Sequence, residues 1–234
     1  MNKIKLTPRL QCVAEMVSPC EIVADIGTDH AYIPMYLVQN GVAKKAVASD
    51  VVDGPVAIAR ANVSDYCLDE YVTVTKAYGL KSAKGADVAV IAGMGGKLIC
   101  DILAEDIEVA RNVGTLVLQP MTCHYELRKF LHENGFAIMR ETLAKEEDKI
   151  YNIMTVSVGE QNFDDDFYYH IGKYLFESGD PLLAEYIHKK SEVLKKRIKG
   201  MKKSQNPEIT AERESLDKLC KRLEKEASCY DKGC

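Results

Sequence analysis

IVADIGTDHAY, residues 22–32, is the stretch that decides the fold. Its apolar start ends in the acid Asp25 and passes through Gly27 toward a helix, which is the pattern of a buried strand followed by a strand-to-helix turn. Open α/β sheets bind nucleotide-like ligands at such turns, outside the carboxyl ends of their strands. Gly27 allows a close approach of the backbone to a ligand because it has no Cβ.

The same turn argues against a dinucleotide. A dinucleotide fingerprint needs further glycines, in the pattern G-x-G-x-x-G, and here the later positions are Asp29 and Ala31. Asp29 would repel a diphosphate, but it suits a ligand that carries an ammonium or a sulfonium. The turn therefore favours S-adenosylmethionine over NAD, although many α/β proteins carry a purely structural acid-glycine turn at this place.

The composition is that of a globular α/β protein without a strong overall charge. Its 234 residues suffice for one α/β domain and an appendage. The net charge is only −4, so any surface for nucleic acid must be local. No apolar run approaches about 18 residues, and the start has no long apolar segment, so neither a membrane span nor an export signal is predicted. The eight cysteines lack C-x-x-C spacing and are expected to be reduced thiols, which predicts a cytoplasmic protein without a metal site.

The first 160 residues alternate strands and helices. Strands are predicted over residues 21–26, 45–49, 71–75, 87–92, 114–118, 136–143 and 151–158, with 145–149 as a charged hairpin loop. Helices are predicted from 8 to 17, 32 to 38, 53 to 66, 97 to 104 and 122 to 133, with Thr7, Asp53 and Thr122 as caps. About seven strands that close in an antiparallel hairpin are typical of an α/β, Rossmann-like class I methyltransferase sheet, although another doubly wound domain also fits.

After Gly159 the strand pattern stops. Apolar residues then recur at helical spacing, and Asn206-Pro207 separates the last helix from those before it. Two long helices in an antiparallel hairpin are the economical interpretation. We therefore predict a ligand-binding sheet domain over residues 1–160 and an α-helical coiled-coil hairpin domain over residues 161–234.

Further candidate binding residues follow the other strands, at the same edge of the predicted sheet. Asp50 ends the second strand, where an acid can accept hydrogen bonds from the ribose hydroxyls of NAD and S-adenosylmethionine alike. Three glycines within residues 93–96 imply backbone in close approach to a ligand or to itself. Gln119 and Pro120 end the fifth strand, and the glutamine could contact a base or hold a loop.

Together these motifs resemble those of the bacterial tRNA (adenine(22)-N1)-methyltransferases. The likeness covers about residues 4–158, whereas the tail matches only as helical architecture. One departure concerns the pair before Gly79, where the family usually has Gly-Asp or Gly-Asn and this chain has Ala77 and Tyr78. The expected contact to the adenine amine is therefore missing, and Tyr78 could stack on the ring instead. The matching segments are DIGTDHAY (25–32), DGP (53–55), GL (79–80), IAGMGG (91–96) and LQP (118–120).

The resemblance implies an enzyme that uses S-adenosylmethionine to methylate N1 of an adenine in tRNA, at position 22. The contacts to the cofactor that it implies come from Asp25, Gly27, Thr28, His30, Asp50, Tyr78, Gly79, Leu80, Ala92, Gly93, Met94 and Gly95. Asp29 or the hydroxyl of Tyr32 is expected to stabilise the cationic product base or to accept a proton; the alternative is that His30 caps the helix and Tyr32 packs against it. Arg9, Gln119 and Pro120 are the candidates for substrate contacts, with Arg9 directed at a phosphate or at the methionine carboxylate.

Basic residues gather in the predicted tail, opposed over that span only by Glu192. They are Lys189, Lys190, Lys195, Lys196, Arg197, Lys199, Lys202 and Lys203. Such a face suits a phosphate backbone, although a solvated coiled-coil face is the alternative. Lys195, Lys196, Arg197 and Lys199 are our candidates for contacts with tRNA.

Two other functions stay open at this point. One is a noncatalytic module that binds S-adenosylmethionine or a nucleotide, and the other is a methyltransferase for a small molecule. No membrane partner is expected, and a monomer is favoured.

Overall fold

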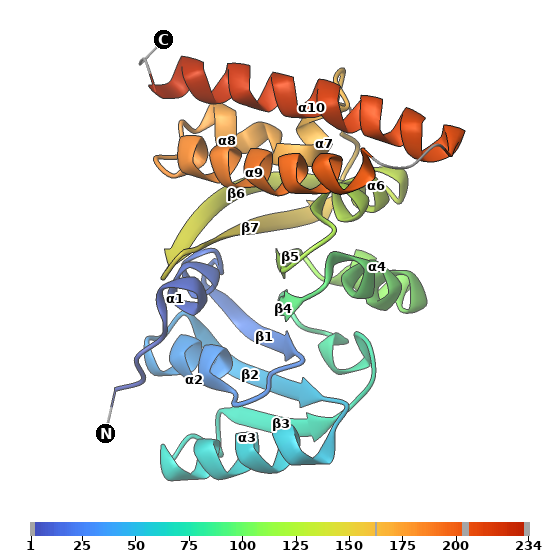
Figure 1. The fold of residues 1–234 in the computed structure, drawn as a ribbon. Helices are drawn as coiled ribbons and strands as arrows, with labels where there is room; N and C mark the ends of the chain where they lie inside the picture. The colour runs from blue at the N-terminus through green and yellow to red at the C-terminus, as the bar shows by residue number, and fades with distance from the viewer. Residues whose placement is uncertain (1–2, 162, 203–205, 232–234) are drawn as a thin grey trace. The chain divides into compact units, whose positions relative to one another are not determined.

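The computed structural model describes residues 3–161, 163–202 and 206–231. The chain forms two compact units, residues 1–170 and residues 171–234. Figure 1 shows the first unit as a sheet with flanking helices and the second as helices alone. The sequence placed the boundary near residue 160, about ten residues earlier.

The sheet has the strand order β3-β2-β1-β4-β5-β7-β6. The strands β1 to β5 run parallel, and β7 lies antiparallel between β5 and β6. This arrangement confirms the predicted Rossmann-like methyltransferase sheet with its closing hairpin. The bounds are β1 (Cys20–Ile26), β2 (Ala43–Asp50), β3 (Val72–Lys76), β4 (Val88–Met94), β5 (Thr115–Pro120), β6 (Phe136–Glu146) and β7 (Lys149–Val158).

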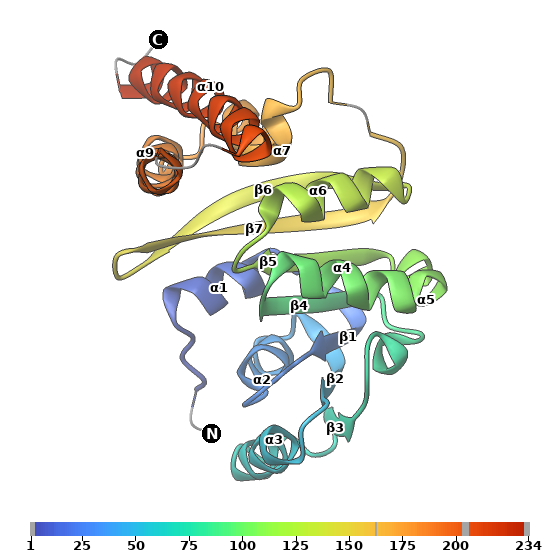
Figure 2. The same cartoon turned by 45° about the vertical axis from the view of Figure 1, so that its right-hand side comes forward.

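Helices cover both faces of the sheet. Figures 1 and 2 show α1 and α2 together on one side and α4 and α6 together on the other. The central strand β4 is therefore buried on both faces, which explains why its sequence is a continuous apolar run. The bounds are α1 (Pro8–Glu15), α2 (Tyr32–Gln39), α3 (Asp53–Asp65), η1 (Lys81–Ala83), α4 (Gly96–Glu105), α5 (Ile107–Asn112) and α6 (His124–Glu133).

Thr7 is the N-cap residue of α1, as predicted, but its side chain does not make the expected cap hydrogen bond. Instead, the carboxylate of Glu146, at the end of β6, accepts the Arg9 N–H at 3.0 Å and a hydrogen bond from the Thr7 side chain. These hydrogen bonds and the nearby Arg9 charge hold the pKa of Glu146 below its ordinary value. A distant strand thus satisfies the first turn of α1.

The other two predicted caps are wrong. Asp53 is the first residue of α3 and makes an ion pair with Lys76 at 2.8 Å. The cap position of α6 is Cys123, in a left-handed conformation, rather than Thr122.

The hairpin of β6 and β7 is tighter than expected. Its strands pair up to Glu146 and Lys149, so only Glu147 and Asp148 form the turn. Glu147 has a left-handed φ of 53°, which is the conformation that two-residue hairpin turns favour. The predicted charged loop over residues 145–149 is therefore mostly strand.

A buried arginine explains why the sheet unit continues past residue 160. Arg128 of α6 is fully buried, and its guanidinium donates to Glu141 Oε1 at 2.8 and 3.0 Å and to Asn152 Oδ1 at 2.8 Å. Its Nη1 donates to the carbonyl of Tyr169 at 2.9 Å. The helix α7 (Phe167–Ile171), which contains Tyr169, is thereby tied to the sheet.

The second unit is the predicted helical hairpin. It contains α8 (Lys173–Glu177), α9 (Leu183–Met201) and α10 (Pro207–Asp231). The helices α9 and α10 pack side by side and antiparallel, because Ser191 lies 3.3 Å from Cys220 while Arg197 pairs with Glu212. Within the described ranges, no helix has the length and the apolar character that a membrane crossing requires.

Candidate functional site

The turns after β1, β2, β4 and β5 lie at one edge of the sheet. The register pairs Ile26 with Ser49 and with Ile91, and Ile91 with Leu118, so these parallel strands end at nearly the same height. Figure 1 shows the arrowheads of β1 to β3 pointing in the same direction. The structure therefore brings most of the predicted binding residues together along this edge, which we call the rim.

The turn after β1 is held by Asp25. This carboxylate is buried and accepts the Thr28 hydroxyl at 2.6 Å, and the N–H groups of Gly27 and Thr28 donate to the Ser49 carbonyl at 2.8 and 2.9 Å. Burial raises the pKa of Asp25 to about 6; the Thr28 hydrogen bond opposes this shift, and the charge of Asp50 adds to it. The Thr28 hydroxyl, which was expected to contact a cofactor, is directed at Asp25 instead.

We expect Asp25→Asn to raise stability at neutral pH, with the gain vanishing in acid. The folded-state pKa of Asp25, about 6, lies above its ordinary value of 3.8. The folded protein therefore binds more protons between these values, and stability falls as pH rises through this window. The unfolding temperature of the variant should exceed that of the wild type at about pH 7.5 and match it below about pH 4. An equal difference at both pH values would contradict the raised pKa.

Two of the next residues of this turn have strained backbone conformations, and one of them, Asp29, is exposed. Asp29 and Ala31 have left-handed φ angles of 52° and 59°, a conformation that disfavours residues with a Cβ by about 1–2 kcal/mol. The Asp29 side chain is 68% exposed and lies 3.5 Å from His30 Nε2. Strain of this kind at an exposed turn is typical of functional sites.

His30 and Tyr32 form a stacked aromatic pair. Their ring centroids are 5.5 Å apart and the rings are inclined by only 14°. The cap position of α2 is Ala31, so His30 does not cap this helix. Tyr32 packs on the His30 ring, but 39% of the tyrosine stays exposed. The pair therefore presents an aromatic surface beside Asp29.

The glycines of the β1 and β4 turns allow close packing between neighbouring turns. A Cβ on Gly27, which has a φ of 72°, would overlap Cε of Met94, so the two turns touch there. A Cβ on Gly96 would lie 2.5 Å from the Cys123 carbonyl oxygen and 2.6 Å from that of Thr122. Gly96 is thus required by backbone packing against the β5 turn, whereas Gly93 is exposed at the rim.

Gln119 holds the β4 turn and Arg9 in place. It is fully buried, its Oε1 accepts from Arg9 Nη1 at 2.8 Å and from the Gly93 N–H at 3.1 Å, and its Nε2 donates to the Pro120 carbonyl at 3.0 Å. The amide is therefore not available to contact a base, which corrects the expected substrate role of Gln119. Pro120, buried as the β5 partner of Met94, likewise shapes the rim without an exposed surface.

Arg9 lies between this glutamine and the hairpin. Its guanidinium carbon is 5.5 Å from the ring centroid of Tyr151, a cation–π distance. A Cβ added to Gly93 would lie 3.5 Å from Arg9 Nη1. Gln119, the Tyr151 ring and the Gly93 backbone thus surround the Arg9 guanidinium at the rim. A cation held in this way is well placed to bind an anion.

The turns after β2 and β3 form an apolar surface next to an acid. Asp50 Oδ1 accepts the Val52 N–H at 3.0 Å, and the Ala77 N–H donates to the Asp50 carbonyl at 3.1 Å. Val51, Val52 and Tyr78 are exposed by 41%, 55% and 63%. Exposed apolar groups around a carboxylate suit an adenosine, whose ring needs a flat apolar contact and whose ribose needs an acceptor. The two valines were missed in the sequence, although their place directly after Asp50 could have indicated them.

Other predicted contacts lie behind the rim. Leu80 is fully buried, and its N–H donates to Asp106 Oδ2 at 2.8 Å. A Cβ on Gly79 would overlap the same carboxylate. Ala92 is partly buried within β4, and a Cβ on Gly95 would come within 3.3 Å of Thr122 Oγ1. These residues support the turns, and the buried side chain of Leu80 packs beneath the rim.

The predicted basic face of α9 is partly neutralised. Lys195 makes ion pairs with Glu192 at 2.7 Å and with Glu224 at 2.8 Å, and these carboxylates raise its pKa. Arg197 pairs with Glu212. Glu192 is the one acid within that stretch of sequence, but α10 supplies two further acids that face these cations.

Two of the four candidate cations are exposed and unpaired in the described ranges. Lys196 and Lys199 are exposed and make no ion pair within the described part of the chain. Lys203 lies outside the described residues. No group of three or more metal-ligating side chains occurs in the ranges that the structure describes.

Similarity to known proteins identifies the family. The methyltransferase domain family matches residues 6–154. A tRNA (adenine(22)-N(1))-methyltransferase of Bacillus subtilis is 36% identical over 164 residues, which are 69% of this chain and 69% of that protein. The chain belongs to the tRNA (adenine(22)-N(1))-methyltransferase family.

Solved structures extend the family likeness into the tail. The crystal structure of the B. subtilis m1A22 tRNA methyltransferase has 27% identity and a TM-score of 0.85, and the match covers 94% of this chain and 99% of that one. A Streptococcus pneumoniae protein in complex with S-adenosyl-L-methionine has 33% identity and a TM-score of 0.84, covering 95% and 99%. The family architecture therefore includes the helical unit, which the sequence motifs did not reach.

Proposed function

We propose that this chain transfers the methyl group of S-adenosylmethionine to N1 of adenine 22 in tRNA. The observation that carries the proposal is the turn after β1. It carries an exposed carboxylate, Asp29, and a stacked aromatic pair at the rim, the edge at which open α/β sheets bind nucleotide-like ligands. A tRNA substrate also implies a cytoplasmic location.

The rim has the groups that S-adenosylmethionine requires. Val51, Val52 and Tyr78 would hold the adenine ring, and the Asp50 carboxylate would accept from the ribose hydroxyls. Arg9 would bind the methionine carboxylate, because its guanidinium is already fixed beside the β4 turn. When bound, the cofactor supplies an electrophilic methyl group on a positively charged sulfur.

Adenine N1 needs positioning more than it needs a base. Its lone pair lies in the ring plane, so N1 forms the new bond to the methyl carbon while the carbon–sulfur bond breaks and its electron pair stays on sulfur. No proton has to leave first, and the enzyme can act mainly by aligning the reacting atoms. Because N1 lies on the Watson–Crick edge, the target adenine must be unpaired or extruded from its helix.

The product adenine carries a positive charge, and the turn after β1 suits that charge. Asp29 would stabilise the developing cation electrostatically. The ring would stack on the pair of His30 and Tyr32, as single-stranded bases do on aromatic side chains. In this arrangement the buried hydrogen bond between Thr28 and Asp25 holds the turn in its conformation.

A labelled-methyl assay with paired transcripts tests the function. We expect the chain to transfer one methyl group from S-adenosylmethionine to a tRNA transcript with adenine at position 22, yielding 1-methyladenosine. A matched transcript with guanine 22 should receive none. Equal labelling of both transcripts would contradict the position, and no labelling by an enzyme that binds the cofactor in calorimetry would favour a noncatalytic module or a small-molecule substrate.

A further inference from the structure

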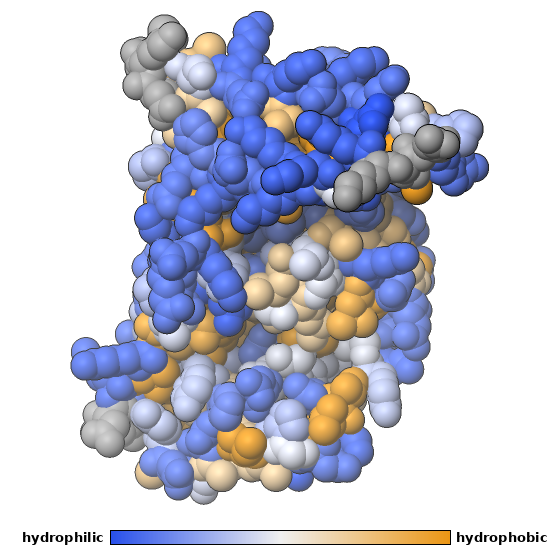
Figure 3. Space-filling model, viewed as in Figure 1, coloured by the Kyte–Doolittle hydropathy of each residue, from blue (hydrophilic) through white to orange (hydrophobic). Residues whose placement is uncertain are grey.

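The surface formed by Val51, Val52 and Tyr78 offers an adenine ring a flat contact but little for its polar edge. Figure 3 shows apolar surface at the place where β2 and β3 end in Figure 1. The loop after β3 is Ala77-Tyr78-Gly79-Leu80, which contains no carboxylate or amide side chain. An adenine amine that leaves water without an acceptor lowers the affinity. A carboxylate or amide for this amine therefore has to come from another element.

Asp106, at the junction of α4 and α5, reaches this loop with its side chain. Its Oδ2 accepts the Leu80 N–H at 2.8 Å. A Cβ on Gly79, which has a left-handed φ of 60°, would overlap the same oxygen. The carboxylate thus lies against the backbone of the two residues that follow Tyr78. Because Tyr78 and Leu80 are two residues apart, their Cα atoms lie within about 7 Å of each other.

The second oxygen of Asp106 is open to a ligand. Asp106 is partly exposed, and its Oδ1 has no hydrogen-bond or ion-pair partner in the described part of the chain and is not buried. The other acids near this surface have different partners. Asp53 binds Lys76 through both oxygens at 2.8 Å, and Asp50 follows β2, where the ribose acceptor is expected. Asp106 therefore brings an open acceptor to the loop after β3.

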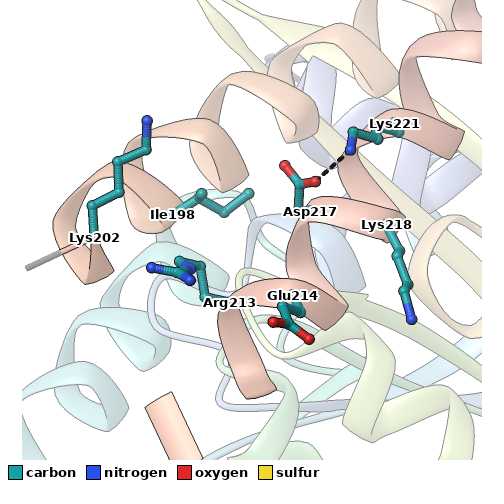
Figure 4. Close-up of a pocket in the computed structure, with 7 residues that line it drawn as sticks. All are labelled: Ile198, Lys202, Arg213, Glu214, Asp217, Lys218 and Lys221. Carbon is teal, nitrogen blue, oxygen red and sulfur yellow. Dashed lines mark ion pairs between the residues drawn. The ribbon is translucent and has the colours of Figure 1, made fainter. Parts of the chain in front are cut away.

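The groove between α9 and α10 does not provide an alternative adenosine site. Its volume is about 600 Å³, and Figure 4 shows it lined by four cations, two acids and Ile198. None of the described lining residues is aromatic, so an adenine ring would find no flat apolar contact there. The rim is therefore the place where an acceptor for the amine matters.

We propose that Asp106 recognises the adenine of S-adenosylmethionine, with Oδ1 accepting a hydrogen bond from the 6-amine while Tyr78 stacks on the ring. The proposal rests on the proposed function for its choice of ligand. The Leu80 N–H holds Oδ2 and so fixes the orientation of the carboxylate. A purine with an oxygen at position 6 would set two acceptors against each other, so the site selects adenosine over inosine. Asp106 acts in binding and not in methyl transfer.

Calorimetry with two ligands tests this role. S-adenosylhomocysteine and S-inosylhomocysteine differ only in the polar groups at positions 1 and 6 of the purine. The wild type should bind the adenosine compound about 10- to 100-fold more tightly, the range for a hydrogen bond to a charged group. In Asp106→Asn the amide oxygen has to accept the Leu80 N–H, which leaves the amide N–H₂ to face the ligand. The preference should then disappear or reverse in favour of the inosine compound.

The matched control is Asp101→Asn, which removes the same charge from an exposed position of α4. It should keep the wild-type preference. Tyr78→Leu should weaken both ligands by a similar factor, because stacking does not depend on the groups at the ring edge.

The outcomes separate the role of Asp106 from the function of the protein. If Asp106→Asn weakens both ligands equally, Asp106 only supports the loop, and the inference is wrong while the proposed function stands. Equal affinity of the wild type for the two compounds would overturn the inference without any variant. A wild type that binds neither compound would contradict the proposed function as well.

Discussion

Replacing Asp29 with asparagine is expected to slow methyl transfer at least about 100-fold, the lower range for losing a charged group that acts on the transition state. The substitution removes a charge and little else. Asparagine has the same shape, and it tolerates the left-handed φ of 52° as well as aspartate does. Because the side chain is 68% exposed, the unfolding temperature should stay within about 1–2 °C of the wild type. Single-turnover rates at saturating tRNA and cofactor measure the effect.

A second variant separates charge from backbone strain. Asp29→Ala removes the charge as well, but alanine adopts the left-handed conformation less readily, so it should be equally slow and slightly less stable. Tyr32→Phe keeps the aromatic stack with His30 and serves as the control for a hydroxyl role. Methyl transfer by Asp29→Asn at the wild-type rate would refute the electrostatic role of this carboxylate.

Arg128→Met is expected to destabilise the sheet unit by about 3–5 kcal/mol, because it leaves a buried carboxylate without its counter-charge. Glu141 is fully buried, and its Oε2 already has no hydrogen-bond partner among the described residues. The arginine also ties α6 to Asn152 and to the Tyr169 carbonyl. A loss of this size corresponds to a fall in unfolding temperature of roughly 10 °C, which differential scanning calorimetry can measure.

The double variant provides the control for this prediction. Arg128→Met with Glu141→Leu removes both charges and fills much of the same volume, so it should recover a large part of the lost stability. A double variant no more stable than Arg128→Met would show that the loss comes from packing rather than from the unpaired charge. Binding of S-adenosylmethionine should change little in either variant, because neither residue lies at the rim.

The strands and their turns were predictable from the sequence because their signals are local. The run from Val88 to Ile91 is apolar throughout, which a strand buried on both faces requires. The acids Asp25 and Asp50 each stand at a strand end, so their common edge followed from parallel pairing alone. The turn after the first strand favoured S-adenosylmethionine over NAD, and the family resemblance then supplied the reaction and its substrate.

What the sequence did not predict depends on contacts between distant residues. Gln119 gave no sign that its amide would hold Arg9, 110 residues away. The acids that neutralise Lys195 and Arg197 lie on α10, and only the register of the two helices shows the pairing.

The carboxylate of Glu146 has a consequence for how the protein is made. It satisfies the first turn of the helix that carries Arg9, yet it is synthesised 137 residues later. A nascent chain can pair its early strands on the ribosome, because domains generally begin to fold from the N-terminal side. The first turn of α1, however, lacks the carboxylate that accepts its N–H until the hairpin of β6 and β7 emerges. We therefore expect a growing polypeptide to complete the setting of Arg9 only after the hairpin of β6 and β7 has been synthesised.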